Sequence, residues 1–106
     1  MSEVWIIRST FASKDEAIST ARTLLEERRI ACANIGDETT SLYRWEGTIQ
    51  QEAETAVIFK TTKTQVAAVI ARIKALHSYQ VPAIVAWPTP STSDSFAHWV
   101  KAEVDS

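Results

Sequence analysis

The sequence predicts an α+β domain in which two helices cover one face of an antiparallel sheet. Short apolar runs and amphipathic helical segments follow one another in the order strand, helix, strand, strand, helix, strand, with a further short helix at the end. The chain has 106 residues, 45% of them hydrophobic, and only three prolines. This length and composition fit one hydrophobic core, so we expect a single domain over residues 1–106.

The first strand and the first helix have clear signals. The run VWII, residues 4–7, is apolar at every position, which is typical of a strand that is covered on both faces or buried centrally in a sheet. Ser13 and Glu16 have the spacing of a capping box, so we expect a helix over residues 13–29. Its apolar residues form one stripe that should face the core: Ala17, Ala21, Leu24 and Leu25.

The middle of the sequence predicts a long β-ribbon. IACANI, residues 30–35, has the composition of a strand, and GDETT, residues 36–40, that of a polar turn before the chain becomes extended again. Glu46 and Gly47 suit a two-residue hairpin turn. The return segment ends in TAVIFK, residues 55–60, which predicts a buried strand.

Apolar side chains occupy both faces of this ribbon. Two-residue alternation places Leu42 and Ile49 on one face, and Tyr43 and Trp45 on the other. A two-stranded ribbon is marginally stable in water unless another surface covers it. We therefore expect the ribbon arm, residues 41–53, to pack on a second chain.

The second half completes the pattern. KTTKT, residues 60–64, lacks the glycines of a phosphate loop, so Thr61, Thr62 or Thr64 is expected to cap a helix that continues to residue 77. AIVAW, residues 83–87, predicts the last strand, and SFAHWVKAEV a C-terminal helix. The order βαββαβ is that of the split βαβ, ferredoxin-like arrangement.

Composition argues against several classes of partner. The 11 basic residues are interspersed among 13 acidic ones, giving a formal charge of -2, so nucleic-acid binding is not expected. A single cysteine makes no intrachain disulfide, which suits a reducing compartment. The apolar run near the N-terminus is too short for a signal segment or a membrane span. We expect a cytoplasmic protein without membrane contact.

Five segments in this order, ACANI, SLYRWEGTIQ, FKT, HSYQVPAI and HWV, resemble the CutA divalent-cation tolerance family over roughly residues 3–104. The resemblance implies a compact homotrimer of ferredoxin-like subunits, similar to PII signalling proteins, in which the ribbon arm builds the trimer. It also implies a role in tolerance of copper and other divalent metals. No turnover reaction is firmly attached to the family, so a non-enzymatic protein is expected.

Cys32 and His77 match family positions for which metal binding has been proposed. Thiolate and imidazole suit copper or zinc, but one cysteine and two histidines fall short of four ligands in one chain. The resemblance therefore implies at most a weak or shared copper site. Alternatively, Cys32 is a small buried strand residue or a reactive nucleophile, and His77 a helix cap or packing residue.

Four further residues match family positions: Tyr43, Trp45, Lys60 and Tyr79. They suggest an alternative function, a PII-like sensor or scaffold that binds a small anion or a partner protein in clefts between subunits. A Cys-His hydrolase is a third hypothesis, which requires Cys32 within hydrogen-bond reach of a histidine. The ribbon glutamates, Glu46, Glu52 and Glu54, are interpreted as a solvated surface.

The segment HSYQVPAI departs from the common family pattern HPYEVPEI. Ser78 replaces a proline, while Gln80 and Ala83 replace two carboxylates, and Phe96 stands where tyrosine is frequent. Hard cations prefer oxygen ligands, so the loss of two carboxylates weakens any hard-cation site in this segment.

Overall fold

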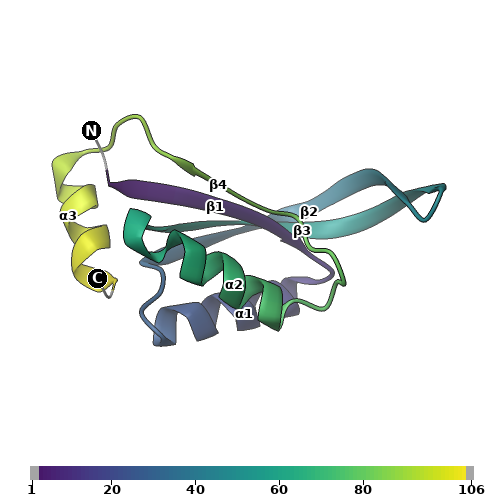
Figure 1. Cartoon of the computed structure of the whole chain (residues 1–106), viewed down its shortest axis with the longest axis horizontal. Helices are drawn as coiled ribbons and strands as arrows, with labels where there is room; N and C mark the ends of the chain where they lie inside the picture. The colour runs from purple at the N-terminus through teal and green to yellow at the C-terminus, as the bar shows by residue number, and fades with distance from the viewer. Residues whose placement is uncertain (1–2, 105–106) are drawn as a thin grey trace.

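The computed structural model describes residues 3–104 and has two main layers (Figure 1). Over this range an antiparallel sheet has the strand order β2-β3-β1-β4. Helices α1 and α2 lie on one face of the sheet, and α3 lies at the end away from the projecting ribbon (Figure 1). This confirms the predicted ferredoxin-like α+β arrangement with a ribbon arm and a short C-terminal helix.

The strands are β1 (Val4–Phe11), β2 (Cys32–Trp45), β3 (Thr48–Thr62) and β4 (Ile84–Pro88). The helices are α1 (Lys14–Glu26), α2 (Val66–Leu76) and α3 (Asp94–Glu103), and a 3-10 turn, η1 (Lys63–Gln65), precedes α2.

Helix α1 begins as predicted and ends earlier. The Ser13 hydroxyl accepts a hydrogen bond from the Glu16 backbone N–H at 3.1 Å, which confirms the cap. At the other end Arg28 has a positive φ of 56°, and the Arg29 N–H donates to the Leu24 carbonyl at 2.9 Å. This Schellman geometry stops the helix at residue 26. The prediction that Leu25 faces the core is wrong, because its side chain is 41% exposed.

The predicted polar turn at residues 36–40 is wrong. Strand β2 continues through this segment with a bulge between Ile35 and Glu38, and Glu38 pairs with Thr55. Inserted residues are accommodated in an antiparallel pair by bending one strand, so a polar, glycine-containing segment here makes a bulge rather than a reversal.

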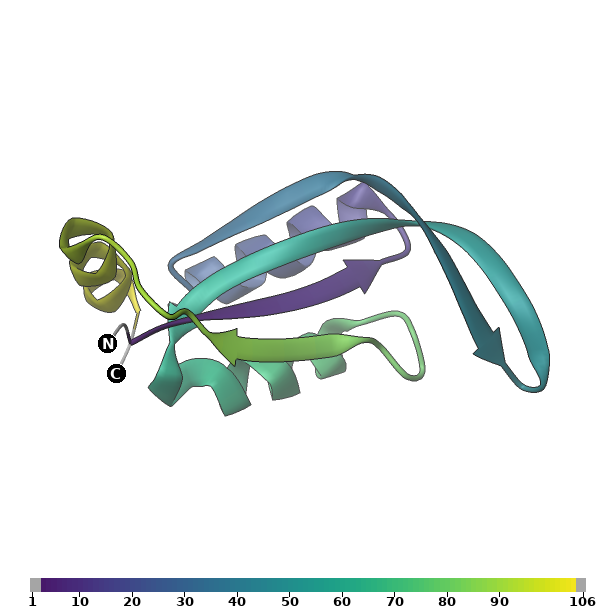
Figure 2. The ribbon, with the colours of Figure 1, turned by 90° about the horizontal axis from the view of Figure 1, so that it is seen from above.

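The hairpin turn and the faces of the ribbon are confirmed. Glu46 and Gly47 have φ values of 48° and 84°, as a two-residue hairpin turn requires. Arg44 pairs with Ile49 and Leu42 with Gln51, so Leu42 and Ile49 share one face. Figure 2 shows the ribbon curving away beyond the sheet.

The start of α2 differs from the prediction. Gln65 is its N-cap residue and makes no capping bond with its side chain. The hydroxyl of Thr61 donates to the Arg29 carbonyl at 2.6 Å, while Thr62 and Thr64 pair with each other at 3.1 Å. The threonine-cap prediction is wrong because the 3-10 turn η1 intervenes between these residues and the helix.

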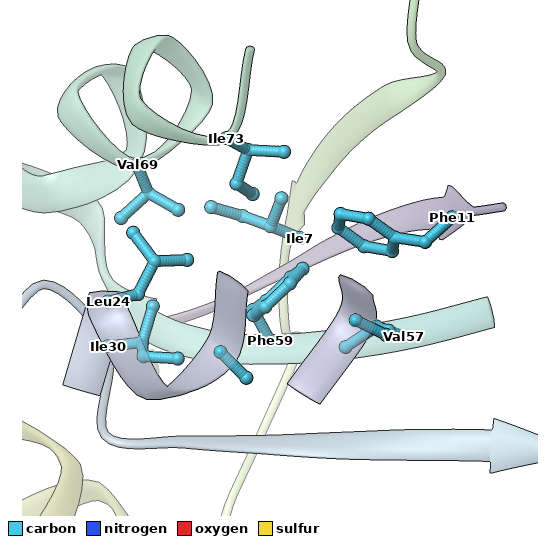
Figure 3. Packing of buried hydrophobic residues seen from close by; sticks show 10 residues of the cluster. Ile7, Phe11, Leu24, Ile30, Val57, Phe59, Val69 and Ile73 are labelled. Carbon is cyan, nitrogen blue, oxygen red and sulfur yellow. The ribbon is translucent and has the colours of Figure 1, made fainter. Parts of the chain in front are cut away.

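The main core lies between the sheet and helices α1 and α2 (Figure 3). Alternate strand residues such as Ile7 and Phe59 point into it, together with Leu24 and Ile73, and all four are fully buried. Among residues 3–104, the opposite face of the sheet is covered only near α3, where a second cluster forms around Val100. Residues 4–7 are therefore not covered on both faces throughout, but β1 lies centrally between β3 and β4, which confirms the alternative prediction of a central strand.

We call the remaining sheet surface the open face. Register places on it alternate residues of all four strands, including half-buried and exposed apolar side chains: Ile6, Ile58, Val85 and Trp87. Val85 is 54% exposed and Trp87 is 40% exposed. A contiguous apolar surface of this kind is available for contact with another chain.

Candidate functional site

Cys32 lies at the start of β2 on the open face. It is the cross-strand partner of Lys60, whose ammonium donates to the Asn34 side-chain oxygen at 2.6 Å. The same ammonium lies 5.9 Å from the centroid of the Phe96 ring. Burial raises the pKa of the Cys32 thiol, while the charge of Lys60 opposes this shift. The thiol is partly exposed and is held mainly in its protonated form.

His77 follows α2 and is buried. Its Nε2 atom is 2.8 Å from the Thr10 carbonyl oxygen, and its Nδ1 atom accepts a hydrogen bond from the Tyr79 backbone N–H at 3.1 Å. These contacts assign the ring proton to Nε2. The ring stacks on Phe11 at a centroid distance of 4.6 Å. Both nitrogens are engaged, so a metal would have to displace one of these bonds.

Cys32 and His77 do not form one site within a chain. Cys32 is paired with Lys60, which is paired in turn with Ile6 of β1, so Cys32 lies beside the position of Ile6 along the sheet. His77 instead contacts Thr10, four residues further along β1. At a rise of about 3.3 Å per residue these two positions are about 13 Å apart. They also lie on different faces, because His77 stacks on a residue of the helix-covered core. A metal ion bound by both residues would have to lie about 2 Å from the sulfur and about 2 Å from the nitrogen, which this separation does not allow within one chain.

Tyr79 and Tyr43 belong to a second group of side chains at the base of the ribbon arm. The Tyr43 hydroxyl donates to the Glu52 carboxylate at 2.6 Å, which raises the pKa of Tyr43. Burial is the largest cause of a raised pKa at Tyr79, and the nearby carboxylates of Glu54 and Glu52 raise it further. Both phenols therefore remain protonated, and that of Tyr43 donates to a carboxylate.

Glu54 corrects the interpretation of the ribbon glutamates as a solvated surface. Glu54 is only 7% exposed, and its carboxylate acts on Tyr79, whose pKa it raises. Tyr79 follows Glu54 by 25 residues, and two-residue alternation does not indicate that they lie near each other. The one sequence signal was that alternation places Glu54 on the same ribbon face as Tyr43.

Trp45 and Lys60 lie at opposite ends of the long ribbon. Trp45 pairs with Thr48 beside the hairpin turn, and Lys60 is twelve residues further along β3, roughly 40 Å at the rise of an extended strand. The expected cleft residues therefore form two separate groups in one chain. A single cleft containing all of them requires residues from different subunits.

Within residues 3–104, no three His, Cys, Asp or Glu side chains come together as ligands for one metal ion. In the same part of the chain, no helix has the length and apolar character needed to cross a membrane.

The fold and its projecting ribbon are shared with solved CutA structures. The CutA structure from the bacterium Xylella fastidiosa is 33% identical, with a TM-score of 0.95 over 98% of this chain and 100% of that one. The periplasmic divalent cation tolerance protein CutA from Archaeoglobus fulgidus is 36% identical, with a TM-score of 0.92 over 96% of this chain and 99% of that one. These likenesses define the class as proteins with the CutA architecture.

Sequence comparison gives the family. The profile described as CutA1 divalent ion tolerance protein matches residues 5–103. The divalent-cation tolerance protein CutA of Thermus thermophilus is 39% identical over 101 residues, which cover 95% of this chain and 96% of that protein. The chain belongs to the CutA divalent ion tolerance family.

Proposed function

We propose that this protein is a non-enzymatic, cytoplasmic homotrimer that takes part in divalent-metal tolerance by binding copper weakly. The observation that carries the proposal is the partly exposed thiol of Cys32, the chain's single cysteine, on the open face of the sheet. A thiol is the soft ligand that copper(I) prefers. Family membership supports the link to divalent metals.

The local chemistry supports weak binding. The raised pKa of Cys32 means that copper must displace a proton from a thiol that burial keeps protonated. His77 joins a copper site only by giving up its bond to Thr10 or to Tyr79. A trimer supplies three copies of each residue, so ligands from different subunits complete a site that one chain lacks.

The trimer proposal is supported by apolar side chains that are exposed to solvent in a single chain. Leu42 and Ile49 on one ribbon face are 67% and 69% exposed, and Tyr43 and Trp45 on the other are each 38% exposed. The open face adds further apolar surface. Burying these side chains against other subunits stabilises the assembly by about 25 cal/mol for each Å² of apolar area removed from water.

Replacing Trp45 tests the arm's role in assembly. Trp45→Ala is expected to shift the molar mass measured by light scattering from trimer toward monomer. Trp99→Ala is the matched control, because Trp99 is similarly exposed at 44% but lies on α3. A Trp45→Ala protein that remains fully trimeric would remove Trp45 from the interface.

Copper binding is tested by competition with a chelator of known affinity. Reduced wild type, Cys32→Ser, His77→Gln and the control His98→Gln are titrated with Cu(I) and with Cu(II). We expect Cys32-dependent binding in wild type, loss of affinity in Cys32→Ser without dissociation of the trimer, and no change in His98→Gln. Millimolar or Cys32-independent affinity would refute the copper role.

A sensor that binds a small anion is the second candidate, and Lys60 favours it. Its ammonium is fixed on the open face by Asn34 and Phe96, whereas the tyrosine group contains Glu52 and Glu54 and repels anions. Nucleotides and organic anions should then raise the thermal midpoint of wild type but not of Lys60→Gln. Lys63→Gln controls for the loss of a nearby positive charge.

The Cys-His hydrolase hypothesis receives no support from the Cys32–His77 pair, because these side chains lie on different faces of the sheet. A nucleophilic thiol requires a base at about 3 Å. Any turnover that used both groups would need them from different subunits.

A further inference from the structure

A hollow of about 270 Å³ lies between the start of β1, the end of β3, and α3 with the loop before it. We call it the α3 hollow; the residues that line it include Val4, Asp94 and Lys101. Figure 1 shows α3 and the start of β1 together at the end of the molecule away from the ribbon. Pockets for drug-sized molecules usually have about 300–1,000 Å³, so an occupant of this hollow is a smaller molecule.

Hydrogen bonds hold the walls of the α3 hollow in place. The Val4 carbonyl accepts from the backbone N–H of Thr89 at 3.0 Å and from its hydroxyl at 2.9 Å, which fixes the loop before α3 on β1. The Lys63 N–H donates to the Glu3 carbonyl at 3.3 Å, and the Ser93 side chain caps α3. The hollow is therefore formed before a ligand arrives, which lowers the entropy cost of binding.

One face of α3 forms a wall of the hollow. The lining residues of this helix are spaced i, i+3, i+4 and i+7, which places them on the same face: Asp94, Ala97, His98 and Lys101. Asp94 and Lys101 are about 10 Å apart along the helix axis, at a rise of about 1.5 Å per residue. The small side chain of Ala97 leaves space between them. The wall thus presents a carboxylate near one end and an ammonium near the other.

The charges in the α3 hollow do not neutralise one another. Glu3, at the approach to β1, is a second lining carboxylate, and it is exposed like Asp94 and Lys101. Within residues 3–104, Lys101 forms no ion pair with either carboxylate. Ligand groups of opposite charge can therefore make charge-assisted hydrogen bonds here without first breaking an ion pair.

The mixed charge of the hollow selects the kind of ligand. Two carboxylates repel polyanions such as nucleotides, and the Lys101 ammonium repels simple cations. A metal ion is disfavoured further, because in the described part of the chain no three His, Cys, Asp or Glu side chains come together around one ion. A small molecule that carries both an ammonium and a carboxylate satisfies both signs of charge.

The distance between the charged residues of α3 narrows this class. An α-amino acid carries its ammonium and carboxylate on one carbon atom, too close together to reach residues about 10 Å apart on a helix. A dipeptide with free termini extends over about 7 Å, at about 3.5 Å per residue. The two protein side chains and a hydrogen bond at each end span the remaining distance.

We propose that the α3 hollow binds a dipeptide with free termini, its ammonium held by Asp94 and its carboxylate by Lys101. Glu3 adds negative charge that excludes anions without an ammonium, and His98 offers its ring nitrogens to the peptide group. This site goes beyond the proposed copper role, because Cys32 does not line it. All of its residues come from one chain, so the site does not depend on the proposed trimer.

A nuclear magnetic resonance titration of the whole protein with dialanine tests the proposal. Backbone amides of residues 89–101 should shift saturably in wild type. N-acetyl-dialanine lacks the ammonium and dialanine amide lacks the carboxylate, so each should bind about tenfold more weakly, the loss appropriate to a hydrogen bond between charged groups. Equal affinity for all three peptides, or no saturable shift up to the solubility of dialanine, would overturn the proposal.

Two variants assign each end of the peptide to its residue. Lys101→Gln should bind dialanine about tenfold more weakly and no longer distinguish it from dialanine amide. Asp94→Asn should lose the preference for dialanine over N-acetyl-dialanine. Glu103→Gln and Lys63→Gln are the matched controls, because neither side chain lines the hollow, and both should keep the wild-type preferences. A Lys101→Gln protein that still prefers the free carboxylate would contradict the assignment.

One further variant separates this site from the copper role. Cys32→Ser should bind dialanine as tightly as wild type, whatever happens to its copper affinity. Loss of dialanine binding in Cys32→Ser would place the peptide outside the α3 hollow and overturn the proposal. Failure of copper binding with intact dialanine binding would leave the site standing and refute only the proposed function.

Discussion

Cys32 and Lys60 face each other across β2 and β3, and burial and the ammonium charge act in opposite directions on the thiol. Burial is the larger influence, so the pKa of Cys32 is raised even with a cation beside it. The pair therefore sets how much thiolate is available to any metal or electrophile.

Removing the Lys60 charge should make Cys32 less reactive. In Lys60→Gln the pKa of the thiol rises further, and the thiolate fraction at pH 8 falls. We expect the rate of reaction with a small disulfide reagent to decrease roughly two- to fivefold. Lys63→Gln should react at the wild-type rate, and an unchanged rate in Lys60→Gln would show that the ammonium has no influence on the thiol.

Leu24 and Leu25 provide a direct test of which residues form the core. Leu24 is fully buried and Leu25 is 41% exposed, although the two are adjacent on α1. Leu24→Ala should lower the free energy of unfolding by about 2–5 kcal/mol, because it leaves a cavity. Leu25→Ala should cost less than about 1 kcal/mol on the same urea titration. Similar losses in both variants would contradict the observed packing of α1.

Arg28→Gly should stabilise the protein. Arg28 has a positive φ of 56° after the end of α1, a conformation that costs a non-glycine residue roughly 1–2 kcal/mol. Glycine loses more entropy on folding, so we expect a net gain of about 0.5 to 1 kcal/mol in chemical denaturation. Arg28→Ala keeps the strain and removes the 3.5 Å contact with the Ala102 carbonyl, so it should give no gain.

The contribution of the Glu27–Arg72 ion pair should depend on pH. Arg72 Nη2 is 2.8 Å from a Glu27 oxygen, and Arg72 Nε approaches both carboxylate oxygens. Hydrogen bonding to Arg72 lowers the pKa of Glu27 below its ordinary value of 4.5. The pair therefore stabilises the fold above that unfolded-state value, and the stabilisation is lost as pH falls through the lowered pKa.

The corresponding experiment compares urea midpoints of wild type and Arg72→Gln at several pH values. The variant should be less stable at pH 7, and the difference should shrink steadily below pH 4.5. Arg22→Gln, on the exposed side of α1, should show no such dependence. A difference that persists undiminished at pH 2 would mean that Arg72 stabilises the fold through packing rather than charge.

Local signals predicted much of this fold. The Ser13 cap depends on two residues three positions apart, and the turn at Glu46–Gly47 on two adjacent residues, so both follow from short-range chemistry. The continuous β2 strand was missed because Gly36 and Asp37 have turn composition. Pairing with β3 decides their conformation, and propensity alone contains no information about that partner.

The site was less predictable because its contacts join distant segments. Cys32 and His77 were singled out, but the sheet separates them by face and by level. The carboxylate of Glu54 acts on Tyr79 only because the segment between α2 and β4 turns back toward the base of the ribbon. Burial of a glutamate in an otherwise exposed ribbon depends on this tertiary contact, which residue type and alternation do not reveal.

The edge strand β4 limits what can be added to the sheet. It spans only Ile84–Pro88 and lies at the border of the sheet next to β1. Pro88 lacks a backbone N–H, and Pro82 and Pro90 bracket the strand. A foreign strand that docked here would find about five residues of ladder and could not extend it, so growth into amyloid-like fibres is blocked at this border.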